Sequence, residues 1–267
     1  MQEEALKLLQ ETAIAAVRAR SIELDGRQLY IAADGEVIDL EQYGELRSRF
    51  RGTFSTNSIP DFVTHVKKQN DISNHVFIDA ETFTAEAIYN YGDNLEPGHC
   101  DDTAVLGLKK TPEFEAVLGI NGCRVDQLRM VDFIEDWHKN LIALKHGVYM
   151  SLSSAIAAVR KITVKSLGDH THEVNNFGAS KSALEEIDAG TATLPETFEF
   201  KCTPYAGLPE HTFILRFGVL TGGEKPLCVL RIVQKEVALE QITQSFKNLL
   251  TDEIGDAATV YIGTFQK

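Results

Sequence analysis

Apolar residues recur at helical spacing at both ends of the chain. The spacing of Leu6, Leu9, Ala13 and Val17 predicts an amphipathic helix over residues 3–19. The stretch "EVALEQITQSFKNLL" has the same period and predicts a helix before a closing strand, "ATVYIGTF". A third helix is predicted in "STNSIPDFVTHVKKQ", where a serine can cap the first turn and a proline suits it.

Alternation of apolar and polar residues marks the predicted strands. "TFTAEAIYNY" alternates and "DTAVLGLKK" predicts its antiparallel return strand, so residues 90–102, "NYGDNLEPGHCDD", form the connecting loop. This loop exceeds the usual hairpin length of about two to five residues. "HTFILRFGVL" and "LCVLRIV" predict a further hairpin around the turn "TGGEKP". Other strands are predicted in "RQLYIAADGEVIDL", "HVFIDA" and "TFEFKCTPY".

The middle of the chain has strong helical patterns, followed by a polar stretch from Thr163 to Gly178 without a clear pattern. "VDQLRMVDFIEDWHKNLIAL", residues 125–144, predicts one long helix, and "SLSSAIAAVRKI" predicts another. "SALEEIDAG" predicts a short helix, because Ser182 and Glu185 have the spacing of a capping box and Gly190 can end it.

These elements predict an α+β fold: two blocks of antiparallel β-hairpins, with amphipathic helices between and after them. Strands and helices do not alternate as in a parallel nucleotide-binding sheet. The expected organisation is an N-terminal α+β region (1–162), a polar connecting region (163–195) and a C-terminal hairpin, helix and strand region (196–267). We expect the three to pack as one globular unit.

Charge and composition narrow the possible partners. The net charge of −13 disfavours direct binding to nucleic acid or to an anionic membrane. Uncharged stretches are too short to span a bilayer, and the acidic start "MQEEALKLLQ" does not resemble an export signal. The dispersed cysteines are expected to be reduced thiols in the cytoplasm. They are Cys100, Cys123, Cys202 and Cys228.

The loop over residues 90–102 has two interpretations. His99, Cys100 and a neighbouring aspartate have suitable donor types for a metal site. However, adjacent donors cannot all face one ion, and glycine, asparagine and proline residues around them are typical of a turn. We favour a solvated loop, and contact with another protein suits it better than chemistry.

A second metal hypothesis concerns "GDHTHE". On a strand, His170 and His172 would face the same way and could bind one ion, with a third ligand such as His99. A solvated polar segment explains the same residues, and we favour it.

No catalytic residue and no cofactor is predicted. The chain lacks the G-x-S-x-G pattern, and "TGGEKP" joins two strands where a phosphate loop joins a strand to a helix. Cys123 in "NGCR" is weak evidence for a reactive thiol. Glu135, Asp136 and His138 could form an acid–base cluster, but their consecutive helical positions indicate a solvated face.

Several stretches together resemble the YfdQ-like family of bacteriophage and prophage proteins, a domain of unknown function. The resemblance covers nearly the whole chain and implies a phage-derived protein in the bacterial cytoplasm, with a role in DNA metabolism, host takeover or assembly. It carries no catalytic residue over. The stretches are "SIPDFVTHVKKQ", "VFIDAETFTAEAIYNYGD", "GHCDDTAVLGLKKTPEFEAVL", "FGASKSALEEIDAG" and "ATVYIGTFQ".

Three functional hypotheses follow. The first is a non-enzymatic prophage protein that acts through homo-oligomerisation and protein contacts, even as a large assembly. The second is a binder of a bacterial replication or defence protein, and the third is a metal-dependent enzyme. For the first, we expect contact surfaces on the 92–102 loop and on the helix over 125–144. The interaction residues are Asp93, Glu96, Asp101, Asp102 and Trp137.

Overall fold

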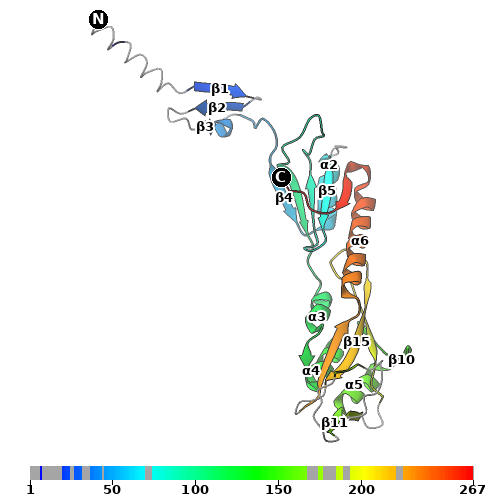
Figure 1. Cartoon of the computed structure of the whole chain (residues 1–267). Coiled ribbons are helices and arrows are strands. Elements are labelled where there is room, and N and C mark those ends of the chain that lie inside the picture. Colours follow the sequence, from blue (N-terminus) through cyan, green and yellow to red (C-terminus); the bar gives the residue numbers. More distant parts are fainter. Residues whose placement is uncertain are drawn as a thin grey trace. The chain divides into compact units, whose positions relative to one another are not determined.

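The computed structural model divides the chain into two units, Met1–Thr53 and Phe54–Lys267, which are described separately (Figure 1). The sequence patterns had not indicated a boundary at this point. The residues that the structure describes are 7, 20–24, 27–31, 37–43, 45–69, 74–166, 174–176, 185–188, 193–220 and 225–266.

The first unit contains an antiparallel three-stranded sheet. Its strands are β1 (Arg20–Leu24), β2 (Arg27–Ile31) and β3 (Val37–Asp39), followed by the 3-10 helix η1 (Glu41–Tyr43). The strands predicted in "RQLYIAADGEVIDL" are confirmed. Of the helix predicted over residues 3–19, only Lys7 is described, and it is helical.

The second unit contains a five-stranded sheet in the order β17-β5-β6-β7-β4, and the boundary between the units falls within β4, after Thr53. The hairpin predicted on either side of residues 90–102 is confirmed as β6 and β7, and the closing strand β17 pairs parallel to β5. Helices α2 and α6 pack against one face of this sheet (Figure 1). The elements are β4 (Gly52–Thr56), β5 (His75–Asp79), β6 (Thr84–Ile88), β7 (Asp102–Gly107), β17 (Thr259–Ile262), α2 (Ile59–Gln69), α6 (Lys235–Ile254) and η2 (Gly255–Ala257).

Strand alternation explains which face the helices cover. Val76 and Ile78 point inward from β5, where they meet the apolar stripes of the helices, represented by Phe62 of α2 and Phe246 of α6. All four side chains are fully buried. The opposite face of β5 therefore carries His75, Phe77 and Asp79, which are half-buried.

A seven-stranded sheet in this unit has the strand order β10-β9-β14-β15-β16-β8, and β12 pairs with β15. Three short helices, α3 (Pro112–Ile120), α4 (Gln127–Asp136) and α5 (Leu152–Arg160), pack around it. Its strands are β8 (Arg124–Val125), β9 (Leu141–Lys145), β10 (Val148–Met150), β12 (Val174–Asn176), β14 (Thr197–Cys202), β15 (His211–Leu220) and β16 (Leu227–Ile232). The hairpin predicted around "TGGEKP" is confirmed as β15 and β16.

A chain of buried rings joins the cores of the two sheets. Phe83, next to β6, stacks on Tyr205 with ring centroids 4.5 Å apart, and Tyr205 meets Phe114 of α3 at 5.5 Å. Phe114 then stacks on Phe213 of β15 at 5.4 Å. We call these four residues the aromatic spine. Because all four are buried, they link the sheets into one hydrophobic core.

Two predicted helices are wrong. The helix predicted over residues 125–144 ends at Asp136, and Leu141–Lys145 forms β9. Pairing with β14 buries Leu141 opposite Phe200, and this tertiary contact outweighs the helical period. In "SALEEIDAG", Glu185–Asp188 forms strand β13, which pairs with β11 (Thr163–Ser166).

The α+β class is confirmed. The three regions predicted from the sequence interleave, because β9 pairs with β14 and β5 pairs with β17. Strands on both sides of the polar region 163–195 thus complete the same sheets.

Candidate interaction surface

The outer face of the five-stranded sheet carries aromatic side chains. Tyr261 of β17 lies opposite Phe77 of β5 in the parallel ladder, with ring centroids 5.6 Å apart. His75 lies one step further along β5, with its ring 5.7 Å from that of Tyr261. Tyr261 is 42% exposed, and the covering helices lie on the other face. Tyr261 is therefore accessible to a partner, with the half-buried rings of His75 and Phe77 beside it.

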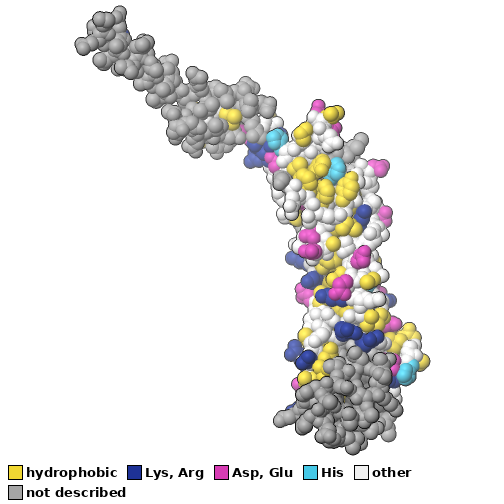
Figure 2. Space-filling view, in the orientation of Figure 1, with side chains coloured by type: hydrophobic (Ala, Val, Ile, Leu, Met, Phe, Trp, Pro, Cys, Tyr) yellow, Lys and Arg dark blue, Asp and Glu magenta, His cyan; other side chains and the backbone are white. Residues whose placement is uncertain are grey.

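Two further rings extend this group beyond the strands. Tyr91, in the loop after β6, stacks on His75 with a centroid distance of 4.4 Å. Phe265, after β17, lies 5.6 Å from Phe77 and meets Tyr91 edge-on at 5.1 Å. We call the set His75, Phe77, Tyr91, Tyr261 and Phe265 the aromatic platform. Figure 2 shows apolar side chains gathered around a histidine over this part of the unit.

The neck of the 90–102 loop is a narrow, hydrogen-bonded ribbon. The amide of Gly98 donates to the carbonyl of Tyr91 at 2.9 Å. Gly92 has a φ of +73°, and a Cβ there would collide with the backbone of Glu96. A Cβ on Gly98 would collide with the backbone of Asn90. The glycines let the two sides of the loop approach closely, so the loop forms an arm with a defined, hydrogen-bonded conformation.

The tip of this arm is held by Asp93. Its carboxylate accepts hydrogen bonds from the amides of Glu96 and Leu95, both at 2.7 Å, and these donors lower the pKa of Asp93. Leu95 is 90% exposed at the tip. Glu96 and His99 are exposed beside it. The arm thus presents one apolar side chain among acidic and polar ones.

The base of the loop is polar and buried. The side chain of Asn90 donates to the carboxylate of Asp101 at 2.8 Å and accepts from the amide of Asp102 at 3.1 Å. Asp102 is only 9% exposed, and its Oδ1 has no hydrogen-bond partner within the described residues. Nearby, the hydroxyl of Tyr89 lies 2.8 Å from Nδ1 of His65.

Burial shifts the pKa values of two side chains at the foot of the loop. It raises the pKa of Asp102, an effect that the charge of His65 opposes and the charge of Asp101 reinforces. Burial, and then the charge of Asp102, also raise the pKa of Tyr89. Asp102 therefore binds its proton more tightly in the folded chain than in the unfolded chain.

We expect Asp102→Asn to stabilise the protein at neutral pH by about 1 kcal/mol, because it removes a buried charge with an unsatisfied oxygen. The stabilising contribution of protonated Asp102 is complete below the pKa that this residue has in the unfolded chain. It is lost as the pH rises through the higher pKa of Asp102 in the folded chain. Urea unfolding over a pH series should show this loss in the wild type and a flatter profile in the variant.

Asp93→Asn is the contrasting control. Because the pKa of Asp93 is lowered in the folded chain, its contribution is present above the unfolded pKa and is lost as the pH falls. The two variants should therefore change the pH profile in opposite directions. Equal profiles for Asp102→Asn and the wild type would show that Asp102 carries no burial penalty.

The predicted interaction residues differ in accessibility. Asp93 and Glu96 lie on the exposed tip, Asp101 is half-buried, and Asp102 lies inside the fold. Trp137 ends α4 and is half-buried, with its ring 6.2 Å from that of Phe200. Their role in contacts remains a prediction, and Asp102 cannot reach a partner without opening the loop base.

The described residues provide no cluster of ligands for either metal hypothesis. His170 and His172 lie outside the described residues, and His99 is exposed on the loop. Within the described ranges, no group of three His, Cys, Asp or Glu side chains could hold a metal ion.

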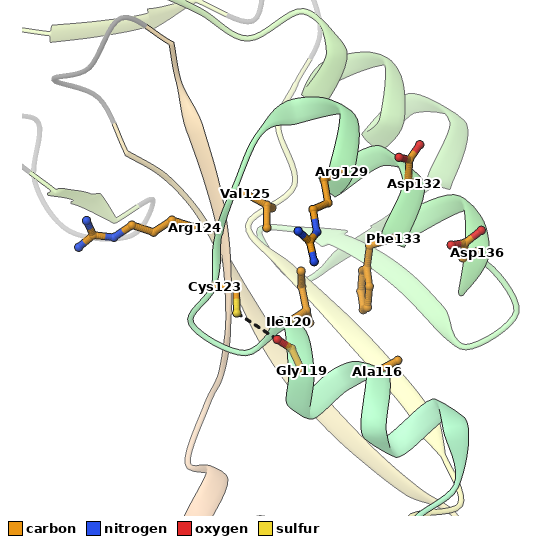
Figure 3. Close-up of a pocket in the computed structure, with 10 residues that line it drawn as sticks. All are labelled: Ala116, Gly119, Ile120, Cys123, Arg124, Val125, Arg129, Asp132, Phe133 and Asp136. Carbon is orange, nitrogen blue, oxygen red and sulfur yellow. Dashed lines mark hydrogen bonds between the residues drawn. The ribbon is translucent and has the colours of Figure 1, made fainter.

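A cavity of about 560 Å³ lies between α3, β8 and α4 (Figure 3). Arg129 points into it, Asp132 and Asp136 stand on its α4 side, and Arg124 points away (Figure 3). The thiol of Cys123 donates to the carbonyl of Gly119 at 3.0 Å. The cavity contains a thiol and mixed charges, but its lining brings no base to the sulfur.

The acid–base residues suggested on α4 have structural partners. Glu135 forms an ion pair with Arg160 of α5 at 2.7 Å, and Nδ1 of His138 lies 2.9 Å from the carbonyl of Glu135. These contacts tie α4 to α5 and close the end of α4. They support the interpretation of a solvated face.

Comparisons with known proteins identify a family without assigning a reaction. In the part of the chain that the structure describes, no helix has the length and apolar character needed to cross a membrane. No curated protein and no solved structure matches the chain. One family model matches residues 2–265, which is nearly the whole chain. The chain therefore belongs to the family described as "Uncharacterized conserved protein (DUF2303)".

Proposed function

We propose that this chain is a non-enzymatic protein of phage or prophage origin that acts in the bacterial cytoplasm through homo-oligomerisation. The observation that carries the proposal is the aromatic platform. Each of the five rings lies within 6.2 Å of at least two others, and Tyr261 is 42% exposed at the edge of the group. The other four rings are half-buried beside it. A cluster of partly accessible aromatic side chains on an uncovered sheet face is typical of protein contacts.

A second copy of the chain is the occupant that suits the platform. The platform extends to β17, which is the edge strand of its sheet among the described residues. Two copies related by a two-fold axis could stack their platforms and set their β17 edges side by side. Aromatic pairs contribute about 0.5–1.5 kcal/mol each beyond their buried area, so several such pairs can hold a dimer.

The 90–102 arm provides a separate contact through which dimers could join into a larger assembly. Its neck is fixed by hydrogen bonds, and its tip exposes Leu95 beside Glu96. A stiff arm loses little conformational entropy on binding, which favours its use in contacts. The phage origin rests on the resemblance of the sequence to the YfdQ-like family.

Co-expression of a tagged and an untagged copy tests self-association directly. We expect the untagged copy to be retained with the tagged one through affinity purification, and to remain after a high-salt wash because the platform is apolar. Purification of the tagged copy alone would contradict the proposal. A stoichiometric host protein in place of the second copy would favour the host-binding hypothesis.

A further inference from the structure

Two arginines face each other on the outer side of the seven-stranded sheet. Arg216 of β15 and Arg231 of β16 are direct partners in the antiparallel ladder. Their Cβ atoms are therefore about 5 Å apart, and like charges placed so closely destabilise a sheet. Both side chains are exposed, and neither forms an ion pair with any described residue.

Helix α6 starts beside this pair. Its N-cap residue, Gln234, has a left-handed backbone (φ 51°, ψ 49°), and its side chain forms no capping hydrogen bond. The first amides of this 20-residue helix therefore lack an acceptor from the N-cap side chain, and the helix dipole places positive potential there. Lys235, the first helical residue, adds a third cationic side chain.

These groups line one cavity of about 450 Å³. The wall also includes Asn121, whose side chain accepts from the amide of Ile232 at 2.8 Å and so is fixed in place. Glu236 is the only carboxylate among the lining residues. Three cations thus face one anion in a protein whose net charge is −13.

We propose that this cavity binds a phosphate group between Arg216, Arg231 and Lys235, with the N-terminal amides of α6 as further donors. Inorganic phosphate or a phosphate monoester suits the site better than a carboxylate because it has more negative charge and at least three terminal oxygens. Two guanidinium groups from adjacent strands can each bind oxygens in a bidentate manner. The bound anion would also relieve the repulsion between the two arginines.

Thermal unfolding in phosphate and in chloride at equal ionic strength tests the proposal. We expect inorganic phosphate to raise the Tm of the wild type in a saturable manner. In Arg216→Gln and Arg231→Gln, the apparent Kd should rise at least about tenfold, because each change removes a charge-assisted contact. Without phosphate, each variant should melt at or above the wild-type Tm, because the like-charge repulsion is gone.

Arg129→Gln is the matched control, since Arg129 is an exposed arginine that lines the other cavity. It should keep the full phosphate response. An equal rise in Tm for wild type, control and both arginine variants would overturn the site. Broadening of the phosphorus NMR signal of inorganic phosphate by wild-type protein gives a check that needs no variant, and an unbroadened signal would also overturn it.

The source of the phosphate group is settled by competition. Displacement of inorganic phosphate by a short single-stranded oligonucleotide, with the same dependence on Arg216 and Arg231, would assign the site to a nucleic-acid backbone. Displacement by nucleotides or sugar phosphates alone would assign it to a small phosphorylated ligand. Binding of either probe that is unchanged in the double variant would contradict the proposal.

Discussion

Replacement of Phe77 by Ser together with Tyr261 by Asp is expected to convert the self-associated protein into monomers while leaving the fold intact. Both side chains lie on the outer face of the five-stranded sheet, where Tyr261 is 42% exposed. A central aromatic residue of an interface contributes about 2 kcal/mol or more, so loss of both should weaken association by about a thousandfold. Sedimentation over a concentration series would measure the change.

The matched control is Ile214→Asp. Ile214 is 39% exposed on the outer face of the seven-stranded sheet. This variant therefore introduces the same charge at a strand position of similar accessibility. The control should retain the mass of the wild type. If the Phe77 and Tyr261 double variant also retained that mass, the platform would not be the interface.

Replacement of Phe114 by Ala is expected to be the most destabilising single change, at about 3–5 kcal/mol. Phe114 is fully buried in the middle of the aromatic spine, between Tyr205 and Phe213. The residue lies in α3, which packs against β14 and β16, so truncation leaves a cavity where the two sheets are joined. Urea unfolding would measure the loss of free energy.

Phe114→Leu is the conservative control, and it should cost less because it fills most of the volume. Phe54→Ala, at a ring that is 37% exposed, should also cost less. A loss below about 1 kcal/mol for Phe114→Ala would show that the spine does not couple the sheets. Two separate unfolding transitions in this variant would show that the sheets unfold independently once the spine is broken.

Local patterns were sufficient for elements whose periodicity agrees with their packing. The hairpin β15–β16 alternates along its length, and α6 keeps an apolar stripe through Ile242, Phe246 and Leu250. The region 125–144 was misassigned because Leu141 and Leu144 continue the helical spacing of α4. Their strand pairing with β14, more than fifty residues later, is not visible in a local window.

The aromatic platform could not be predicted for a similar reason. His75 and Phe77 alternate with Val76 and Ile78 as in any strand, and Tyr261 lies in an unremarkable closing strand. The surface exists only because β17 pairs in parallel with β5. The sequence offered one signal, an aromatic residue at the outward position of each of two strands. This signal indicates a surface only once the two strands are known to be adjacent.

The pair of arginines could not be predicted from the sequence for the same reason. Arg216 and Arg231 each occupy the polar position of an alternating strand, which is ordinary for an exposed face. Only the structure shows that the two arginines lie opposite each other and that α6 begins beside them. By contrast, the loop over 90–102 was correctly placed, because its glycines and aspartates have turn chemistry that is local.

The most direct test of self-association is the absolute mass of the purified wild-type protein, measured by light scattering at micromolar concentration, with metal analysis of the same fraction. The account predicts a discrete multiple of the 29.6 kDa chain without stoichiometric metal. A monomer would contradict it, and a monomer with one metal ion per chain would direct attention to His99, His170 and His172.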